Sequence, residues 1–337
     1  MSGAPSPKIA PESSNAHSPC SSGNKTLEFL PDQMTSMDSF GFQIPRVDRL
    51  VSLCLTHPVA KLVNRPSELR VPILLYHSIS ESLFGKSRPF SQINTSPAVF
   101  SMQMRWLRQA GYRTIDLSEM LAALEAGKDV SKAVVITFDD GYEDFYTEAF
   151  PVMKQCGFTA TVFLTTDRIR DTPVRIEGAN HLTWRQVREL HAEGIRFGSH
   201  TVTHPDLRSL EPEQIDYELA YSKETIEQKL GESVSNFSYP FAFPEEDSRF
   251  KRFLVDVLGN IGFENGVSSI IGRAEPDKNQ FFLPRLPMNS WDDAKLLQAK
   301  LEGGYDWMHW PQWLHKFAYH NASLMQRSSS IRWDAVR

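Results

Sequence analysis

The sequence predicts an α/β fold built on parallel strands. From residue 71 to residue 241, short apolar runs alternate with amphipathic segments, and glycines close several of the amphipathic segments just before the next apolar run. Of the 337 residues, 41% are hydrophobic and 23% are charged, which suits a packed core. Such alternation indicates consecutive β-α-β units with right-handed crossovers, arranged as a barrel or as a doubly wound sheet.

The individual elements follow from length and periodicity. Apolar runs of strand length predict strands over residues 71–79, 133–138, 159–164, 196–200 and 233–241. Apolar positions at helical spacing predict helices over residues 96–111, 146–157, 183–194 and 212–231. The first of these helices has a Ser-Pro start and ends at Gly111, both typical helix boundaries.

The chain divides into four parts by composition. Residues 1–46 are expected to be disordered, because their Ser-, Pro-, Asn- and Gly-rich sequence buries too little apolar surface to offset the loss of chain entropy. Residues 47–70 form a lead-in helix and linker, with helical spacing as far as Pro58. The main domain is expected over residues 71–320, followed by a polar tail over residues 321–337.

The overall charge and the cysteines narrow the function classes. The net charge is −5 and the basic residues are scattered, which argues against a nucleic-acid or anionic-membrane partner. No apolar run is long enough to span a membrane, and the N-terminus lacks the apolar core of a signal peptide. Three cysteines match no disulfide or zinc framework. A cytoplasmic protein is therefore expected, and no protein partner is indicated.

Two adjacent aspartates, Asp139 and Asp140, follow the apolar run 133–138. Neighbouring side chains on a strand point to opposite faces, so both can serve one site only where the strand ends. Gly141 provides the backbone freedom for such a turn. In parallel α/β folds, sites form at the carboxyl ends of strands. The alternative is that the pair caps the helix that follows.

Two histidines, His200 and His204, follow the apolar run that ends near residue 200. Their spacing would place both imidazoles on one face of a helical turn, as in zinc sites, although Pro205 disfavours a long helix here. Taken alone, they could be ordinary histidines. Together with the aspartates, they supply the two histidines and one carboxylate of a catalytic zinc site, and one aspartate remains to act as a base.

The motifs TFDDG (Thr137–Gly141) and SHTVTHP (Ser199–Pro205) resemble those of the polysaccharide deacetylase family, that is, the NodB homology domain of carbohydrate esterase family 4. Flanking sequence is similar to the poly-N-acetylglucosamine deacetylase subgroup, and the resemblance spans residues 71–286. It implies a distorted (β/α) barrel with fewer than eight complete units. It also implies a divalent metal, Zn²⁺ fitting best, held by Asp140, His200 and His204, with Asp139 as general base and an N-acetylated carbohydrate as substrate.

The third family motif, often RPPYG, corresponds here to SYPFAF (Ser238–Phe243). Ser238 stands where the family has the arginine that orients the base, and Arg285 is a candidate to replace it from another strand end. The oxyanion donor is a backbone N–H, which Phe241 can supply. Tyr239 either lines the substrate site or forms part of a strand-end turn.

The last family motif, L-x-H, supplies the general acid and is not found here. His77, at the end of the first strand, either reaches the site or is an ordinary strand-end histidine. Tyr142 is a candidate to line a sugar cleft, because aromatic faces pack against pyranose rings.

The leading hypothesis is a metal-dependent hydrolase that removes N-acetyl groups from a glycan or glycan precursor. An esterase for O-acetylated sugars would use the same metal site. A glycan-binding relic of the fold would keep the metal ligands without turnover, as the missing L-x-H motif favours. A retaining glycosidase ranks last, because its two carboxylates must lie on opposite sides of the sugar bond.

Overall fold

The computed structural model describes residues 46–63, 69–81, 94–176, 178–241, 243–314 and 316. The expected disorder of the N-terminal extension and the expected polar tail fall outside these residues, with the exception of Arg46. All described residues belong to one compact unit.

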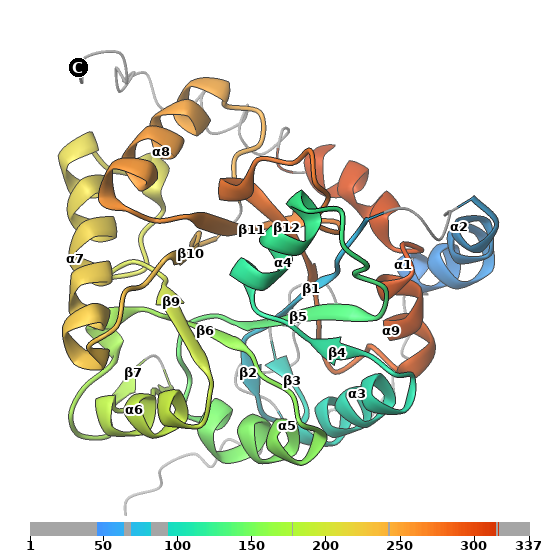
Figure 1. Cartoon of the computed structure of the whole chain (residues 1–337), viewed down its shortest axis with the longest axis horizontal. Coiled ribbons are helices and arrows are strands. Elements are labelled where there is room, and N and C mark those ends of the chain that lie inside the picture. The colour runs from blue at the N-terminus through green and yellow to red at the C-terminus, as the bar shows by residue number, and fades with distance from the viewer. Residues whose placement is uncertain are drawn as a thin grey trace, which may run out of the picture. The chain divides into compact units, whose positions relative to one another are not determined.

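Parallel strands form a closed barrel at the centre of this unit (Figure 1). Within the described residues, one eight-stranded sheet runs in the order β1-β12-β11-β10-β9-β6-β5-β4, and β5 pairs also with β1, which closes seven of the strands into a ring. The closure confirms the predicted barrel and rules out an open, doubly wound sheet. The strands of the sheet are β1 (Ile73–Tyr76), β4 (Arg113–Thr114), β5 (Ala133–Phe138), β6 (Thr161–Leu164), β9 (Arg196–Ser199), β10 (Asn236–Ser238), β11 (Asn265–Ile271) and β12 (Leu283–Pro287).

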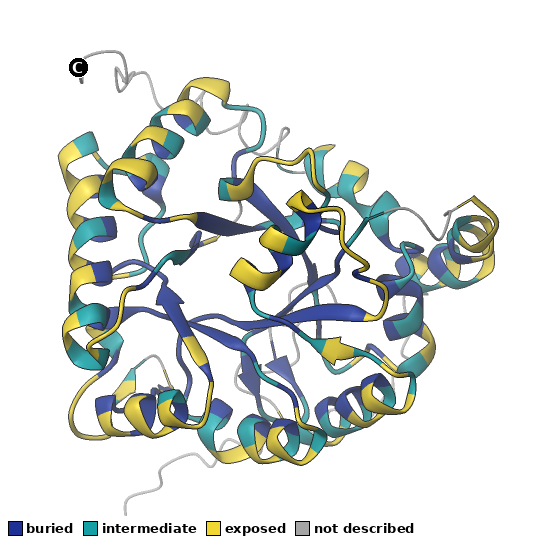
Figure 2. Cartoon of the chain, viewed as in Figure 1, coloured by how far each residue is buried: buried dark blue, intermediate teal, exposed yellow. Residues whose placement is uncertain are grey.

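The barrel strands are buried on both faces over most of their length, as Figure 2 shows by their dark colour, while the surrounding helices alternate buried and exposed positions. All six residues of β5 and all four residues of β1 and β6 are buried. Burial on both faces explains why these strands read as continuous apolar runs.

Helices surround the barrel, and several of them begin at capping residues that the sequence offers. Ser96 caps α3 by accepting a hydrogen bond from the Val99 N–H, and Thr183 caps α6 in a reciprocal capping box with Gln186. The longer helices are α3 (Pro97–Gln109), α4 (Leu117–Glu125), α5 (Phe150–Cys156), α6 (Trp184–Ala192), α7 (Pro212–Leu230), α8 (Ser248–Ile261) and α9 (Ala294–Leu301). Short segments add η2 (Phe145–Ala149), η3 (Thr166–Arg168), η4 (Leu207–Ser209), η5 (Gln280–Phe282), η6 (Asp306–Met308) and the strand pairs β2 (Ser78–Ile79) with β3 (Asn94–Thr95) and β7 (Arg175–Ile176) with β8 (Ala179–Asn180).

The lead-in helix extends further than its sequence predicts. It consists of α1 (Val47–Val51), a π-helical turn η1 (Ser52–Thr56) and α2 (His57–Val63), so it continues through Pro58. Proline removes a helical N–H and crowds the preceding turn, and the wider π turn before it accommodates that change. Across the part of the chain described, none of the helices has the length and apolar character needed to cross a bilayer.

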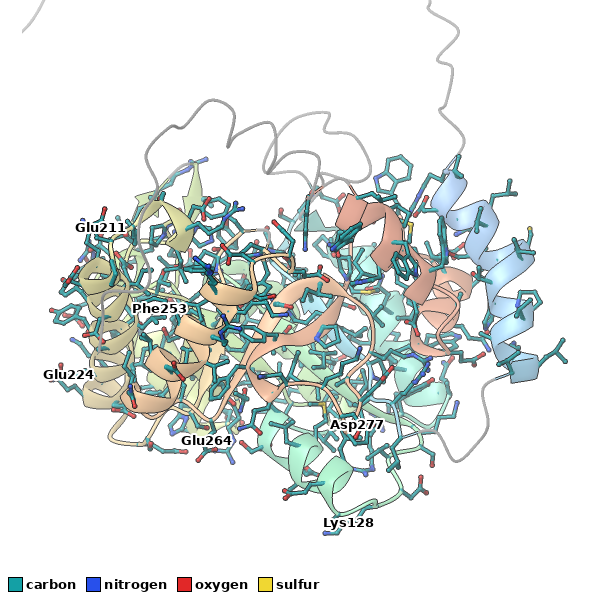
Figure 3. All side chains as sticks on the ribbon, turned by 90° about the horizontal axis from the view of Figure 1, so that it is seen from above. Lys128, Glu211, Glu224, Phe253, Glu264 and Asp277 are labelled. Atoms are coloured by element: carbon teal, nitrogen blue, oxygen red, sulfur yellow. The ribbon has the colours of Figure 1, made fainter. Side chains whose placement is uncertain are left out.

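Two hydrophobic cores lie on the two faces of the barrel strands, one outside the barrel and one inside it. The larger core lies between the barrel and the outer helices. The smaller core fills the barrel interior and includes Met120 and Leu124 of α4, which close the end where the strands begin. Figure 3 gives the side view: Lys128 and Glu264, just before β5 and β11, lie at one end, and Glu211, just before α7, lies at the other. The carboxyl ends of the strands are therefore free of α4 and can carry a site.

Candidate metal centre

The aspartate pair lies at the carboxyl end of β5, where the strand turns. Val135 belongs to the core inside the barrel, whereas Ile136 and Phe138 belong to the outer core, so alternation along the strand directs Thr137 and Asp139 inward. Asp140 then adopts a left-handed backbone, with φ 72°, and Gly141 follows with φ 69°. This turn replaces the strand alternation, so both aspartates can serve one site.

The histidines come from the loop after β9. His200 follows directly, and Thr201 and His204 both adopt left-handed backbone conformations, with φ 67° and 63°. The His204 N–H donates a hydrogen bond to Thr201 Oγ1 at 3.0 Å. The expected single helical turn is wrong: the segment is a bent loop, because left-handed residues interrupt any helix.

Asp140, His200 and His204 converge in space. Asp140 Oδ1 lies 3.7 Å from His200 Nε2 and 3.4 Å from His204 Nε2. One ligand atom from each residue lies within 4.8 Å of the others. His200 Nδ1 lies 2.8 Å from the backbone carbonyl of Ser238, which can only accept a hydrogen bond. His200 Nδ1 therefore carries a proton, and Nε2, on the side of Asp140, is the ring nitrogen that could bind a cation.

These three residues, called the trio below, fit a cation. Asp140 Oδ1 is buried and has no hydrogen-bond donor among the residues described. Burial, the largest effect on this side chain, lowers the pKa of His204 to about 4, so its imidazole is neutral at pH 7 and can offer a lone pair. Two imidazoles and a carboxylate form a donor set that suits Zn²⁺ and related divalent metals.

Asp139 is bound to a buried arginine from β12. Arg285 Nη1 donates to Asp139 Oδ1 at 2.8 Å, and Arg285 Nη2 donates to Asp139 Oδ2 at 2.7 Å. Arg285 is 1% exposed and Asp139 is 3% exposed. Ser238 adds a hydrogen bond from its hydroxyl to Asp139 Oδ2 at 3.2 Å. Ser238, which stands where the family has its arginine, therefore contacts the same Asp139 carboxylate as Arg285.

Arg285 is itself fixed by other residues of the barrel interior. Its Nε donates to the backbone carbonyl of Ser268 at 2.9 Å, and its Nη1 donates to Thr137 Oγ1 at 3.2 Å. Sequence reasoning missed Thr137 and Ser268 as contacts of this arginine. Thr137 could have been found, because it precedes Asp139 by two residues and so shares its strand face.

The charge of Asp139 follows from these contacts. Burial alone would raise the pKa of Asp139, but the charge and the hydrogen bonds of Arg285 outweigh it and hold the pKa well below its usual value. The carboxylate is ionised at neutral pH. Its Oδ2 lies 4.0 Å from His200 Nε2, which places the charge beside the trio.

Phe241 and His77 also lie near the trio. The Phe241 ring is 4.6 Å from the His204 ring, edge to face, and Phe241 is 58% exposed with φ 58°. Burial lowers the pKa of His77, against the raising effect of Asp139 and Asp140.

The two tyrosines differ in their surroundings. Tyr142 packs against His181 with 5.0 Å between ring centroids, and burial together with Asp140 raises its pKa. Tyr239 is 3% exposed, and its ring packs against Phe237, Phe243 and Phe282. A ring enclosed in this way presents little surface to a substrate.

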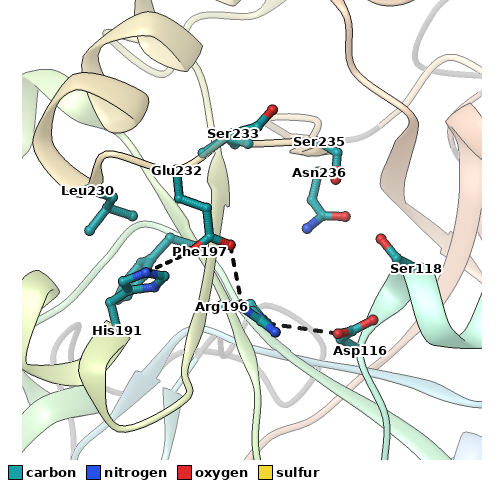
Figure 4. A pocket seen from close by; sticks show the side chains of 11 residues that line it. Asp116, Ser118, His191, Arg196, Phe197, Leu230, Glu232, Ser233, Ser235 and Asn236 are labelled. Carbon is teal, nitrogen blue, oxygen red and sulfur yellow. Dashed lines mark hydrogen bonds and ion pairs between the residues drawn. The ribbon is translucent and has the colours of Figure 1, made fainter.

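A separate pocket of about 240 Å³ contains none of the predicted site residues (Figure 4). It lies where β9 and β10 begin, whereas the trio lies beyond the end of β9. Its charged side chains pair with one another: Arg196 Nη1 lies 3.5 Å from Glu232 Oε1, and His191 Nε2 lies 2.9 Å from Glu232 Oε2. Its place and its paired charges separate it from the candidate metal centre.

Fold and site together define an α/β barrel protein with a candidate metal centre at the carboxyl ends of its strands. A family model described as polysaccharide deacetylase matches residues 126–254. The protein YxkH of Bacillus subtilis (strain 168), which is named as a polysaccharide deacetylase, is 32% identical over 240 residues, covering 71% of this chain and 78% of that protein. The poly-beta-1,6-N-acetyl-D-glucosamine N-deacetylase of Staphylococcus aureus (strain MSSA476) is 25% identical over 223 residues, covering 63% of this chain and 72% of that protein.

Solved structures show the same fold. The deacetylase PplD of Streptococcus pyogenes superposes with a TM-score of 0.59 at 24% identity, over 69% of this chain and 99% of that one. IcaB from Ammonifex degensii superposes with a TM-score of 0.57 at 22% identity, over 69% of this chain and 97% of that one. The chain belongs to the polysaccharide deacetylase family.

Proposed function

We propose that this chain is a metal-dependent hydrolase that removes N-acetyl groups from a glycan or glycan precursor. Family membership supports deacetylation. The name of the Staphylococcus aureus relative favours an amide over an ester as the bond that is cut. The observation that carries the proposal is the Asp139–Arg285 pair beside the trio. A protein that only bound glycan would have no use for a second carboxylate kept ionised at this place.

In this proposal, Asp140, His200 and His204 hold the cation, and Zn²⁺ is the metal that this donor set fits best. When bound, the cation would act as a Lewis acid that acidifies water and polarises the acetyl carbonyl. The buried Asp140 Oδ1, which has no hydrogen-bond donor among the described residues, supports this assignment.

Asp139 acts as the general base. Its low pKa keeps it ionised, and Arg285 holds both of its oxygens in a fixed orientation. It takes a proton from the water that attacks the acetyl carbon. The carbon–nitrogen bond then breaks, and the proton passes to the leaving amine, so that the products are acetate and a free amino sugar.

The remaining groups stabilise the substrate and its charges. The Phe241 backbone N–H is proposed as the donor to the developing oxyanion, and the exposed Phe241 ring beside His204 as part of the sugar-binding surface. Tyr142 is proposed to line the same surface. His77 is proposed to assist protonation of the amine, because it lies close enough for the charges of Asp139 and Asp140 to act on its pKa.

The test measures bound metal and acetate release from N-acetylated oligosaccharides. Asp139→Asn should keep the metal and lower turnover by roughly 10²–10⁴-fold, because the base is lost and the trio is untouched. His204→Ala should lose both metal and turnover. Asp306→Asn, at a half-buried acid bound to Arg273 instead, is the control and should keep both. Equal turnover of the parent, Asp139→Asn and His204→Ala would contradict the assigned roles.

Product analysis separates the proposed activity from its nearest alternative. Amide hydrolysis releases a free amine, whereas an esterase acting on O-acetylated sugar releases a hydroxyl group. Metal and glycan binding without release of either product would instead show a binding protein.

A further inference from the structure

The loop that carries His200 and His204 is strained. Thr201 and His204 have positive φ angles of 67° and 63°, in the left-handed region that β-branched residues in particular avoid. Strained residues of this kind persist only where the surrounding structure holds them in place. Whatever holds this loop therefore fixes the distance between the two imidazoles.

A buried carboxylate on α7 makes direct contact with the loop. Glu218 Oε2 accepts hydrogen bonds from the backbone N–H groups of Val202 at 2.8 Å and Thr203 at 2.9 Å. Glu218 Oε1 accepts a hydrogen bond from Thr203 Oγ1 at 2.7 Å. Glu218 is 7% exposed, and among the described residues all of its hydrogen bonds go to this loop.

The other contacts of the loop hold different groups. The backbone N–H groups of Thr166 and Asp167 donate to the loop carbonyls of Thr201 at 3.2 Å and Val202 at 2.9 Å. Those contacts hold carbonyl oxygens, whereas Glu218 is the acceptor for the two N–H groups between Thr201 and His204. Without Glu218, these N–H groups would lose their partner at the point where the backbone is most strained.

We infer that Glu218 is a positioning residue of the metal centre: it holds the loop so that His200 and His204 reach the Asp140 carboxylate together. It acts through the loop backbone and touches neither imidazole. The inference rests on the proposed function, because it assumes that the trio binds a cation. Residues that orient metal ligands in this way commonly change metal affinity by about 10–100-fold when they are replaced.

Two variants separate position from charge. Glu218→Gln keeps the length of the side chain and an oxygen that can accept from both N–H groups, but removes the charge. Glu218→Asp keeps the charge but is one methylene too short to reach all three partners. If Glu218 acts by position, Gln preserves cation affinity and Asp weakens it. If it acts only by attracting the cation electrostatically, the order is reversed.

The same helix offers a matched control. Glu227 accepts hydrogen bonds from Lys223 Nζ at 2.6 Å and from the Val234 N–H at 2.9 Å, so it too ties a loop to α7. That loop leads into β10 at the amino end of the barrel, away from the trio. Glu227→Ala therefore removes a comparable contact and should lower thermal stability without changing the metal centre.

The experiment titrates the metal-free full-length chain with Co²⁺, and follows the visible absorption of the bound ion in competition with a chelator. We expect Glu218→Ala and Glu218→Asp to weaken Co²⁺ binding by at least about tenfold, Glu218→Gln to recover most of the affinity, and Glu227→Ala to bind like the parent. Melting temperatures of the metal-free variants are measured alongside. Where Glu218→Ala does not fold, the comparison of Asp with Gln decides.

Three results would overturn the inference. They are parent-like Co²⁺ binding by Glu218→Asp, weaker binding by Glu218→Gln than by Glu218→Asp, and an equal loss in Glu227→Ala. A parent chain that binds neither Co²⁺ nor Zn²⁺ would instead overturn the proposed function, and this inference with it.

Discussion

Replacement of Arg285 by methionine tests the buried pair at the centre of the site. Arg285 and Asp139 are 1% and 3% exposed, and two hydrogen bonds of 2.8 and 2.7 Å join them, so solvent screens the pair very little. Removing one partner of such a pair leaves a buried, uncompensated charge, which costs about 3–5 kcal/mol. For a domain of this size, we expect the melting temperature of the metal-free protein to fall by roughly 6–20 °C at pH 8.

The pH dependence gives the sharper test. In the parent, Arg285 holds the pKa of Asp139 below its unfolded value, so the stabilisation is present above the unfolded pKa and is lost as the pH falls towards the folded pKa. In Arg285→Met, burial acts without the arginine and raises the pKa of Asp139 above its unfolded value. Stability then increases as the pH falls through the raised pKa. The difference in melting temperature between parent and variant should therefore narrow on acidification.

Turnover should also depend on the ionisation of the Asp139 carboxylate. With a raised pKa, Asp139 is protonated over more of the acidic range, so the acid limb of the turnover profile should move to higher pH. Arg273→Met is the control, because Arg273 also binds a carboxylate, that of the half-buried Asp306, at 2.9 Å but lies outside the trio. The Arg273→Met variant should be less stable than the parent but show the same acid limb in its pH–turnover profile. An unshifted acid limb in Arg285→Met, with a constant stability difference between pH 5 and pH 8, would refute the reasoning.

Two further predictions concern Phe241, beside the trio, and Met120, at the end of the barrel that α4 closes. Phe241→Gly keeps the backbone N–H, and glycine accepts the observed φ of 58°. If this N–H is the oxyanion donor, kcat should fall by less than about tenfold, while KM rises because the ring beside His204 is lost. A fall of kcat by 10²-fold or more would contradict the role of the N–H. Met120 lies in α4, which closes the opposite end of the barrel, and it is fully buried in the core inside the barrel. Met120→Ala should therefore lower the free energy of unfolding, measured by chemical denaturation, by about 2–5 kcal/mol and leave the bound metal unchanged. A loss of metal would show that the two ends of the barrel are coupled.

The alternation of strands and helices was readable because each element carries its own periodicity. The β5 run over residues 133–138 and the glycine-terminated helix α7 appear in the structure close to their predicted bounds. Barrel closure was not readable, because it depends on pairing between β1 and β5, whose residues are about sixty positions apart. The family resemblance supplied the barrel where periodicity left a doubly wound sheet equally open.

Tyr239 shows where residue type gives too little information. A tyrosine after an apolar run suits a substrate site or a turn equally well, and only the packing of Phe237, Phe243 and Phe282 around its ring assigns its surroundings. The loop conformation was equally hidden. A spacing of four residues suggested a helical turn for His200 and His204, whereas the structure brings them together through two left-handed residues.

By itself, the sequence determined that acidic and histidine side chains would follow the ends of parallel strands, because local periodicity fixes where strands stop and parallel strands share one carboxyl edge. Only the tertiary structure decided which groups these side chains meet. Arg285 reaches Asp139 across 146 positions of sequence, and Glu218 holds the histidine loop from a neighbouring helix. Such contacts depend on closure of the barrel and on rotamers chosen in a packed interior, and no local pattern of residues encodes them.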